Sequence, residues 1–347
     1  MKRDSLKKTL ILFVIALAVC ASVFLPLPYY VEKPGSTIDL KELITVNEKK
    51  DQSDGSFYLT SVGVQQASVI TALKAKLSPF EELVSEDELF GGASGKEYDQ
   101  MQNYYMESSQ NNAIEQALKL AKRPYDFEYK GVYVMNVMKN SSFKNDIAVG
   151  DTVTKVDGKS FKNHQAFMDY VQQKSVGDTV TVTYEHNNKA EKASGKLMKL
   201  PSNQKAGIGI TLVDHTDIKT KDKIDFHVNN IGGPSAGLMF TLEIYEQLTG
   251  KDLRKGKEIA GTGTMGNDGK VGRISGIDKK VASADKKNVQ IFFAPDDSLT
   301  KEERKENPGI KSNYQEAKSA ADKLDSHMKI VPVKTLQDAI DFLEEMN

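Results

Sequence analysis

Residue types that often build sites or cross-links are scarce in this 347-residue sequence, which has no tryptophan and a single cysteine, Cys20. The chain beyond Cys20 therefore contains no disulfide, but an exported protein can fold without one, so this scarcity does not decide the compartment. Basic and acidic residues nearly balance, at 47 Lys+Arg against 48 Asp+Glu. A net charge this close to zero gives no case for nucleic-acid binding.

Histidine is sparse as well, and none of the histidines stands in a glycine-rich or otherwise special setting. The five are His164, His186, His215, His227 and His327. Histidine is the usual base beside a serine nucleophile, and the other well-attested base is a lysine whose amine is held neutral by burial. A serine site in this chain therefore points to lysine as its partner.

A nucleotide-binding loop of the form Gly-x-x-x-x-Gly-Lys-Ser/Thr is absent. The nearest match runs from Gly91 to Glu97, but its spacing is too short and Glu97 replaces the metal-binding hydroxyl. We interpret it as a flexible loop. We expect the chain to bind no nucleotide, no metal and no other cofactor.

One long apolar run is present near the start of the sequence. The stretch Met1–Lys8 is basic, and no charge then occurs until Glu32. About twenty apolar residues suffice to span a bilayer, and a basic flank favours a cytoplasmic N-terminus. We therefore predict one membrane anchor through residues 9–28, with the rest of the chain outside the cell. Two alternatives are a signal peptide cleaved near Cys20 and a lipoprotein, but the run continues to Leu25, which favours an uncleaved anchor.

The most informative motif is a glycine-rich turn that presents a serine. The segment Ile231–Gly237 has the sequence IGGPSAG, and an apolar, helix-compatible run follows from Leu238 to Tyr245. The hydroxyl of Ser235 is thereby expected at the mouth of a helix, where free N–H groups and the helix dipole stabilise an oxyanion. The alternative is an ordinary helix start, with small residues for close packing.

A lysine suited to act as the base follows downstream. A strand-like run breaks at Ser275-Gly276, and a helix begins in which Ile277, Lys280 and Val281 share one face. Lys280 therefore points among apolar neighbours, whereas Lys279 is expected to point toward solvent. Ammonium groups are rarely buried without a purpose.

Together the two motifs resemble the proteolytic domain of the Lon-type serine peptidases over roughly residues 220 to 345. The family pattern Gly-Pro-Ser-Ala-Gly is matched by Gly233, Pro234, Ser235, Ala236 and Gly237, and its lysine pattern by Val271, Ile274, Gly276, Ile277 and Lys280. The resemblance implies a Ser–Lys dyad, with Ser235 as nucleophile and Lys280 as general base. It further implies supporting roles for Gly233, Pro234 and Ala236, and for Thr264 as a hydrogen-bond partner of the lysine amine.

The chain departs from this family in two ways. Many Lon enzymes have a Lys-Asp pair just before Gly-Pro-Ser, but Ile231-Gly232 stands there in this sequence. The ATP-driven members carry an ATPase module, for which no motif is found. The resemblance therefore implies an ATP-independent relative.

A second module precedes the serine motif. Strand-like alternation from Gly131 to Met138 is followed by the run Ile147–Gly158, which ends in the turn signal Asp157-Gly158, and Asn163 can cap a helix. This pattern resembles a PDZ domain of the bacterial protease-associated kind. The resemblance implies that Lys130, Gly131, Val132, Tyr133 and Val134 bind a peptide, which adds as a strand beside the first strand and the capped helix. The alternative is a β-rich spacer that binds nothing.

The segment between the anchor and this module is harder to interpret. We predict a strand at Phe57–Val62, a helix at Ala67–Leu77, a mobile acidic excursion at Glu81–Gln102 and a helix at Ser108–Lys122. Such a set has little core of its own, so we expect it to pack on the proteolytic domain, with the PDZ unit inserted into that domain.

The predicted fold class is α+β: a Lon-type proteolytic domain plus a PDZ domain, which is a small β-rich barrel with helices, preceded by one transmembrane helix. The expected units are an anchor at 1–30, an N-terminal segment at 31–125, a PDZ domain at 126–200 and a proteolytic domain at 201–347. The order resembles that of the PDZ-containing, membrane-anchored Lon-like peptidases of Gram-positive bacteria.

The expected function is cleavage of peptides or flexible segments of exported proteins, with secreted signalling peptides as one class. The expected partners are a peptide or protein substrate and the membrane, and ring formation, common among Lon-type domains, leaves a homo-oligomer open. The alternative is a non-enzymatic extracellular PDZ adaptor with a degenerate peptidase fold.

Overall fold

The computed structural model describes residues 7, 10–15, 22–228 and 231–346. The predicted anchor falls partly outside these residues. Within the described residues, no helix is both long enough and apolar enough to cross a membrane.

A six-stranded mixed sheet forms the centre of the molecule, in the order β17-β16-β13-β3-β1-β4. Its strands are β1 (Pro26–Asp39), β3 (Ser56–Ser68), β4 (Glu82–Ser85), β13 (Glu258–Gly261), β16 (Ile291–Pro295) and β17 (Lys329–Val333). The strands β3, β13, β16 and β17 run parallel, and β1 is antiparallel to both β3 and β4. Because β3 pairs directly with β13, the N-terminal and C-terminal parts of the chain build one sheet.

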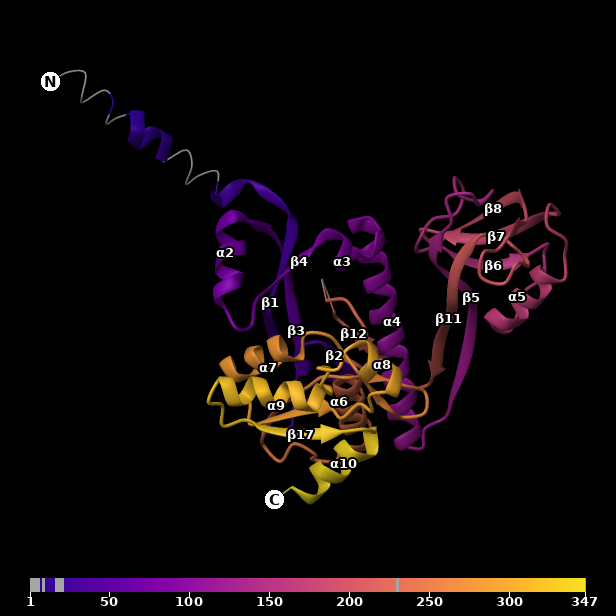
Figure 1. The fold of residues 1–347 in the computed structure, drawn as a ribbon. Coiled ribbons are helices and arrows are strands. Elements are labelled where there is room, and N and C mark those ends of the chain that lie inside the picture. Colours follow the sequence, from indigo (N-terminus) through magenta and orange to yellow (C-terminus); the bar gives the residue numbers. More distant parts are fainter. Residues whose placement is uncertain (1–6, 8–9, 16–21, 229–230, 347) are drawn as a thin grey trace.

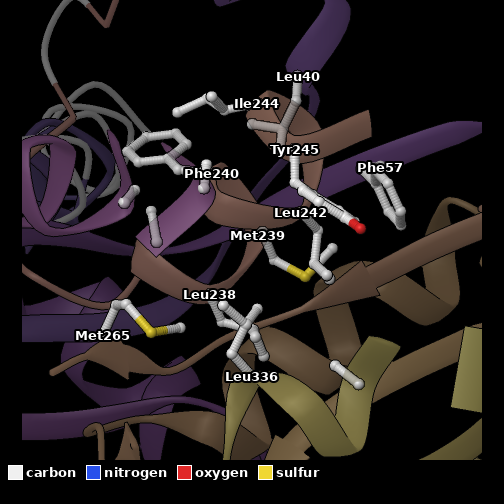
Figure 2. Packing of buried hydrophobic residues seen from close by; sticks show 14 of the residues in the cluster. Leu40, Phe57, Leu238, Met239, Phe240, Leu242, Ile244, Tyr245, Met265 and Leu336 are labelled. Carbon is white, nitrogen blue, oxygen red and sulfur yellow. The ribbon is translucent and has the colours of Figure 1, made fainter. Parts of the chain in front are cut away.

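Helices cover both faces of this sheet. They are α6 (Gly237–Thr249) and α10 (Leu336–Glu345) on one face, and α7 (Ile277–Lys286) and α9 (Asn313–Lys323) on the other. The sheet side chains alternate between these two cores, since Phe57 and Leu59 pack with α6 while Tyr58 packs with α7. Figure 2 shows the first core, in which the apolar residues of α6 meet Phe57, Met265 and Leu336. Eleven of the thirteen α6 residues are buried, and the two buried glutamates among them, Glu243 and Glu246, form ion pairs with Arg254.

The remaining short elements connect these layers. They are the 3-10 helix at Leu40–Glu42, β2 (Ile44–Val46), β12 (Ile224–Phe226), β14 (Thr264–Met265), β15 (Val271–Gly272) and α8 (Lys301–Glu306).

A separate unit of residues 125–220 is inserted between α4 (Gly95–Leu120) and β12, and Figure 1 shows it beside α4, away from the C-terminal helices. We call it the inserted unit. Its five-stranded sheet has the order β11-β5-β6-β7-β8. The elements are β5 (Tyr125–Val137), β6 (Thr152–Val156), α5 (His164–Gln172), β7 (Thr179–His186), β8 (Lys189–Lys196), β9 (Met198–Lys199), β10 (Ala206–Gly207) and β11 (Ile210–Thr220). The predicted cap is present, because the Asn163 side chain accepts a hydrogen bond from the Ala166 N–H.

The prediction of a mobile excursion at residues 81–102 is wrong. This stretch forms β4, α3 (Glu86–Phe90) and the first two turns of α4. Ser85 with Glu88 and Ser94 with Glu97 form capping boxes, which fix the starts of both helices. The glycine-rich stretch at 91–97, interpreted as a flexible loop, is the tight connection between these two helices, with Gly91 in the left-handed conformation.

A short helix, α2 (Val69–Leu77), follows β3 directly. Its small residues Ala72 and Ala75 pack with Val31 on the β1–β4 part of the sheet. In Figure 1 this helix lies on the side from which the N-terminal segment leaves the body.

Candidate active site

The serine turn is held from one side by the strand segment that follows α6 in the chain. The main-chain carbonyl of Ser235 accepts hydrogen bonds from the Gly263 N–H at 2.9 Å and from Thr262 Oγ1 at 3.0 Å. Ser235 comes just before Ala236, the N-cap residue of α6. Its hydroxyl therefore lies at the helix start, as the glycine-rich motif indicates.

The same turn is held from the other side by α4. The Gly233 N–H donates to the Gln102 carbonyl at 3.0 Å, and Ser109 Oγ donates to the Pro234 carbonyl at 3.1 Å. Gly233 has a φ of 90°, a left-handed conformation that favours glycine. The residues before Ser235 are thus fixed by main-chain contacts rather than by their own side chains.

Lys280 reaches Ser235 from α7. Its Nζ lies 2.8 Å from Ser235 Oγ and donates to the main-chain carbonyl of Thr60 at 2.7 Å. The residue is only 4 % exposed. Burial lowers the pKa of the amine from 10.5 to about 7, and no charged partner opposes this shift. The amine is therefore available as a neutral base near neutral pH.

Lys279 does not point toward solvent, so that part of the sequence prediction is wrong. It is also 4 % exposed, and its Nζ lies 2.9 Å from Glu82 on β4 and 3.7 Å from Glu32 on β1. Burial lowers its pKa, but the hydrogen bond to Glu82 and the nearby carboxylates outweigh burial and raise the pKa. The strands β1 and β4 bring carboxylates to this face, which helical periodicity alone does not reveal.

Thr264 lines the same cleft, but the structure places no hydrogen bond between it and the Lys280 amine, whose two partners are Ser235 and Thr60. That expected contact is therefore wrong. Thr262, two residues earlier, is the threonine that contacts the serine turn, through the Ser235 carbonyl.

Ser235 and Lys280 open into a cleft of about 1230 Å³. Its walls come from β1, β3, β4, α3, α4, the serine turn and the segment before α7. The carboxyl groups of Glu32, Glu88 and Asp99 line the cleft together with Arg273. Burial raises the pKa of Glu32, and the charge of Lys279 only partly offsets this. This volume exceeds the roughly 300–1,000 Å³ that is usual for small-molecule pockets.

One wall of the cleft is an open strand edge. β13 pairs with β3 only from Ser56 to Leu59, and Thr60–Val64 then line the cleft. Because β1 occupies the other edge of β3, the groups of Thr60–Val64 that face the cleft lack a strand partner among the described residues. An extended peptide could pair with this edge beside Ser235.

The predicted peptide-binding residues of the inserted unit lie in a strand whose two edges are both paired. On β5, Gly131 pairs with His215 of β11, and Val132 pairs with both Asp214 of β11 and Val153 of β6. The expectation that a peptide adds beside this strand is therefore wrong, because β11 already occupies that place. Gly131 is required by the fold itself: its φ is 151°, and a side chain would clash with the Val153 carbonyl.

The side chains of these residues are also engaged within the molecule. Lys130 forms ion pairs with Asp217 and Glu107, and Tyr133 stacks on Tyr104 of α4 with ring centroids 4.3 Å apart. Val132 and Val134 are fully buried in the core of the unit. The edge strand next to β5 is β11, whose Asp214 carboxylate contacts His164 at the start of α5; β8 forms the other edge of the sheet.

Several residues around the dyad carried no signal that sequence reasoning used. Thr60 and Gln102 act through main-chain carbonyls, which any residue type supplies, and Ser109 is one of two adjacent serines on a polar helix. Only the fold brings these positions to the serine turn.

Family models match two parts of this chain. Residues 106–197 match the PDZ domain, and residues 210–343 match the Lon protease (S16) C-terminal proteolytic domain. These matches support a serine protease that carries a PDZ domain. No curated protein matches the chain significantly.

Several solved structures are similar to part of this chain. The PDZ domains of SdrC-like proteins from Listeria monocytogenes and Listeria innocua are each 44 % identical, with TM-scores of 0.24. They cover 25 % and 24 % of this chain, and 90 % and 96 % of their own. A solution structure from Geobacillus thermodenitrificans is 32 % identical over 24 % of this chain and 95 % of its own, with a TM-score of 0.22.

Proposed function

This chain carries a PDZ domain and a C-terminal proteolytic domain of the Lon (S16) type, and from this premise we propose that it is an ATP-independent serine endopeptidase. Ser235 is the nucleophile and Lys280 is the general base. The observation that carries the proposal is the 2.8 Å contact between Ser235 Oγ and a buried lysine amine whose pKa is lowered to about 7.

The chemistry follows from this pair. The neutral Lys280 amine takes the proton of the Ser235 hydroxyl while Oγ attacks the peptide carbonyl carbon. Main-chain N–H groups at the start of α6 stabilise the oxyanion. The lysine ammonium then gives its proton to the leaving amine as the peptide bond breaks. A water molecule, deprotonated by the lysine, hydrolyses the acyl ester and restores the serine.

The cleft favours extended, unfolded segments as substrates. A folded chain offers no free strand to the open edge of β3, and no nucleotide-binding motif is present to drive unfolding. We propose that the enzyme cleaves peptides or flexible parts of exported proteins, and that the PDZ domain docks such segments. Since β5 is paired on both sides, we propose docking at the outer edge of β11 over residues 210–213, before the Asp214 and Thr216 carbonyls that α4 side chains contact.

We further propose that the apolar segment 9–28 anchors the chain in the cell membrane with the catalytic region outside. The sequence supports this with a basic flank followed by an uncharged run. Protease added to intact cells would then digest the region beyond Tyr30, while the full-length protein would stay in the membrane fraction. A soluble mature form that starts near residue 20 would contradict the anchor.

The decisive experiment on catalysis compares three variants of the full chain on a flexible peptide. Ser235→Ala and Lys280→Ala should each lower kcat by roughly 10⁴-fold or more, and the double variant should be little worse than either, because the two groups act as one unit. Lys286→Ala is the matched control, since this lysine lies exposed on the same helix. Turnover retained in pure Ser235→Ala would refute the mechanism, whereas a parent protein without any turnover would favour the adaptor alternative.

A further inference from the structure

The helix α2 has its apolar side turned outward. Ile70, Leu73 and Leu77 are 51 %, 59 % and 87 % exposed, whereas the buried face carries only the small residues Ala72 and Ala75. In an ordinary surface helix the large aliphatic residues face the core. The inverted pattern leaves a large apolar surface uncovered on this side of the molecule.

The exposed residues form one stripe with basic borders. Positions 70, 73 and 77 follow the three- and four-residue spacing of a single helix face, and Val69 extends it. Lys74 and Lys76 lie on the two flanks of this stripe, and α2 contains no acidic residue. Aliphatic residues bordered by lysines are typical of helices that lie in a membrane interface, where the lysine heads reach the lipid phosphates.

The position of α2 in the chain identifies the surface that it faces. Pro26, the first residue of β1, pairs with Ser68, the residue that caps α2. The helix therefore begins beside the point where the chain leaves the apolar segment 9–28. Phe24 and Leu25, at the end of that segment, are 79 % and 59 % exposed. The helix that carries the apolar stripe thus starts close to the end of the proposed anchor.

We propose that α2 lies against the outer surface of the membrane, with Val69, Ile70, Leu73 and Leu77 among the lipid chains and Lys74 and Lys76 at the headgroups. The contact rests on the proposed anchor, which holds the helix at the bilayer, and is independent of the peptidase reaction. It gives the catalytic body a second attachment and a defined orientation over the membrane.

The test measures lipid contact in the full chain. Because Cys20 is the only cysteine, a Cys20→Ser background accepts single labelling sites. Leu73→Cys is labelled with an environment-sensitive fluorophore, and the chain is reconstituted into phosphatidylcholine–phosphatidylglycerol vesicles with or without brominated acyl chains. Brominated lipid should quench the probe at position 73. The control is Gln165→Cys on α5, a helix of equal length, where the exposed probe should not be quenched.

A second variant separates the helix from the anchor. With the probe at Ile70→Cys, the pair Leu73→Gln and Leu77→Gln should abolish quenching, while the protein still floats with vesicles through residues 9–28 and retains its circular dichroism. Flotation without quenching at position 73 would overturn the role of α2 and leave the anchor intact. Unlabelled Leu73→Cys that is oxidised to a disulfide between two copies, together with no quenching of the labelled protein, would assign the stripe to self-association and overturn the proposal. Absence of flotation would refute both the anchor and the contact.

Discussion

At the scale of single residues, two neighbouring lysines on α7 have opposite environments. Lys280 is buried among apolar groups with neutral hydrogen-bond partners, and its pKa falls to about 7. Lys279 is equally buried but faces Glu82 and Glu32, and its pKa is raised. One lysine is thereby suited to proton transfer, and the other holds β1 and β4 against α7 as a permanent cation.

The lowered pKa of Lys280 predicts a pH dependence with a defined sign. Since the neutral amine is the proposed base, kcat/KM on a short peptide should rise with pH, reach half its maximum near the pKa of about 7, and then level off. Well below that pKa it should fall about tenfold per pH unit. A profile recorded from about pH 5 to about pH 9 checks this.

The matched control is Glu32→Gln, because the pKa of Glu32 is raised and its side chain lines the same cleft. The midpoint should persist in this variant. A midpoint that disappears with Glu32 would assign the titration to the carboxyl group instead of the lysine.

From the ion pairs of Lys279 we predict that its removal lowers the stability of the protein rather than the rate of catalysis. Lys279→Ala leaves Glu32 partly buried without its cation, and this should lower the free energy of unfolding by roughly 1–3 kcal/mol, since the exposed partner Glu82 contributes less. Urea denaturation measures the change. Lys286→Ala should lie within about 0.5 kcal/mol of the parent protein. Equal stabilities for the two variants would contradict the role given to the ion pairs.

At the scale of elements, the sequence was most informative where local pattern and function coincide. The starts of α6 and α7 are recognisable from Gly-Pro-Ser and Ser-Gly, and the apolar stripe of α7 places Lys280 inward. The partner of the amine could not be predicted, because Thr60 contributes a main-chain carbonyl from a strand remote in sequence. Strand alternation likewise identified β5, but pairing with β11 depends on the whole sheet.

The two helix starts within residues 81–102 can be recognised from the sequence, although the prediction of a mobile excursion there is wrong. Ser85-x-x-Glu88 and Ser94-x-x-Glu97 are capping-box patterns, and each marks a helix start that composition alone obscures. The acidic, glycine-interrupted composition of this stretch suggests a mobile loop, but the Ser-x-x-Glu spacing indicates the two helix starts.

The cap of α4 predicts a local effect on the cleft. Ser94→Ala should cost about 1 kcal/mol and fray the first turn, from which Tyr98 and Asp99 line the cleft. Hydrogen exchange at the start of α4 should accelerate, and KM for a peptide should rise. Thr300→Ala removes an equivalent capping box from α8, outside the cleft, and should leave KM unchanged. The same KM in both variants would mean that this turn does not contact substrate.

At the scale of the whole molecule, the chain runs through one sheet, leaves it for the inserted unit and returns. Tyr125 and Thr220, at the two ends of this unit, pair with each other. Paired antiparallel residues lie about 5 Å apart, so the unit can be removed without separating its flanks. The sequence indicates this insertion only indirectly. The N-terminal segment has too little core to fold alone, so it is expected to pack on the proteolytic domain that follows the inserted unit in the chain.

Removing the inserted unit distinguishes two roles for it, which are docking of the substrate and mechanical support of α4. Replacing residues 126–219 by Asn-Gly, a two-residue hairpin turn, should preserve cleavage of a short peptide. Cleavage of a long substrate should fall by about 10²-fold or more, because a docked chain meets the dyad intramolecularly. The measurement is the ratio of kcat/KM for the two substrates. An equal loss on both would mean that the unit supports α4, which contacts it through Tyr104 and Asn111.

The length of β3 sets the distance between the lysine site and the start of α2. Thr60, the lysine's partner, and Ser68, the cap of α2, are eight residues apart on one continuous strand, which corresponds to roughly 27 Å at ~3.4 Å per residue. If α2 rests on the lipid, this length is the greatest height at which the strand can hold Thr60 above the level of Ser68. Substrates tethered to the same membrane would then be cut at a height that the strand sets, so cleavage sites would be chosen by distance from the membrane as well as by sequence.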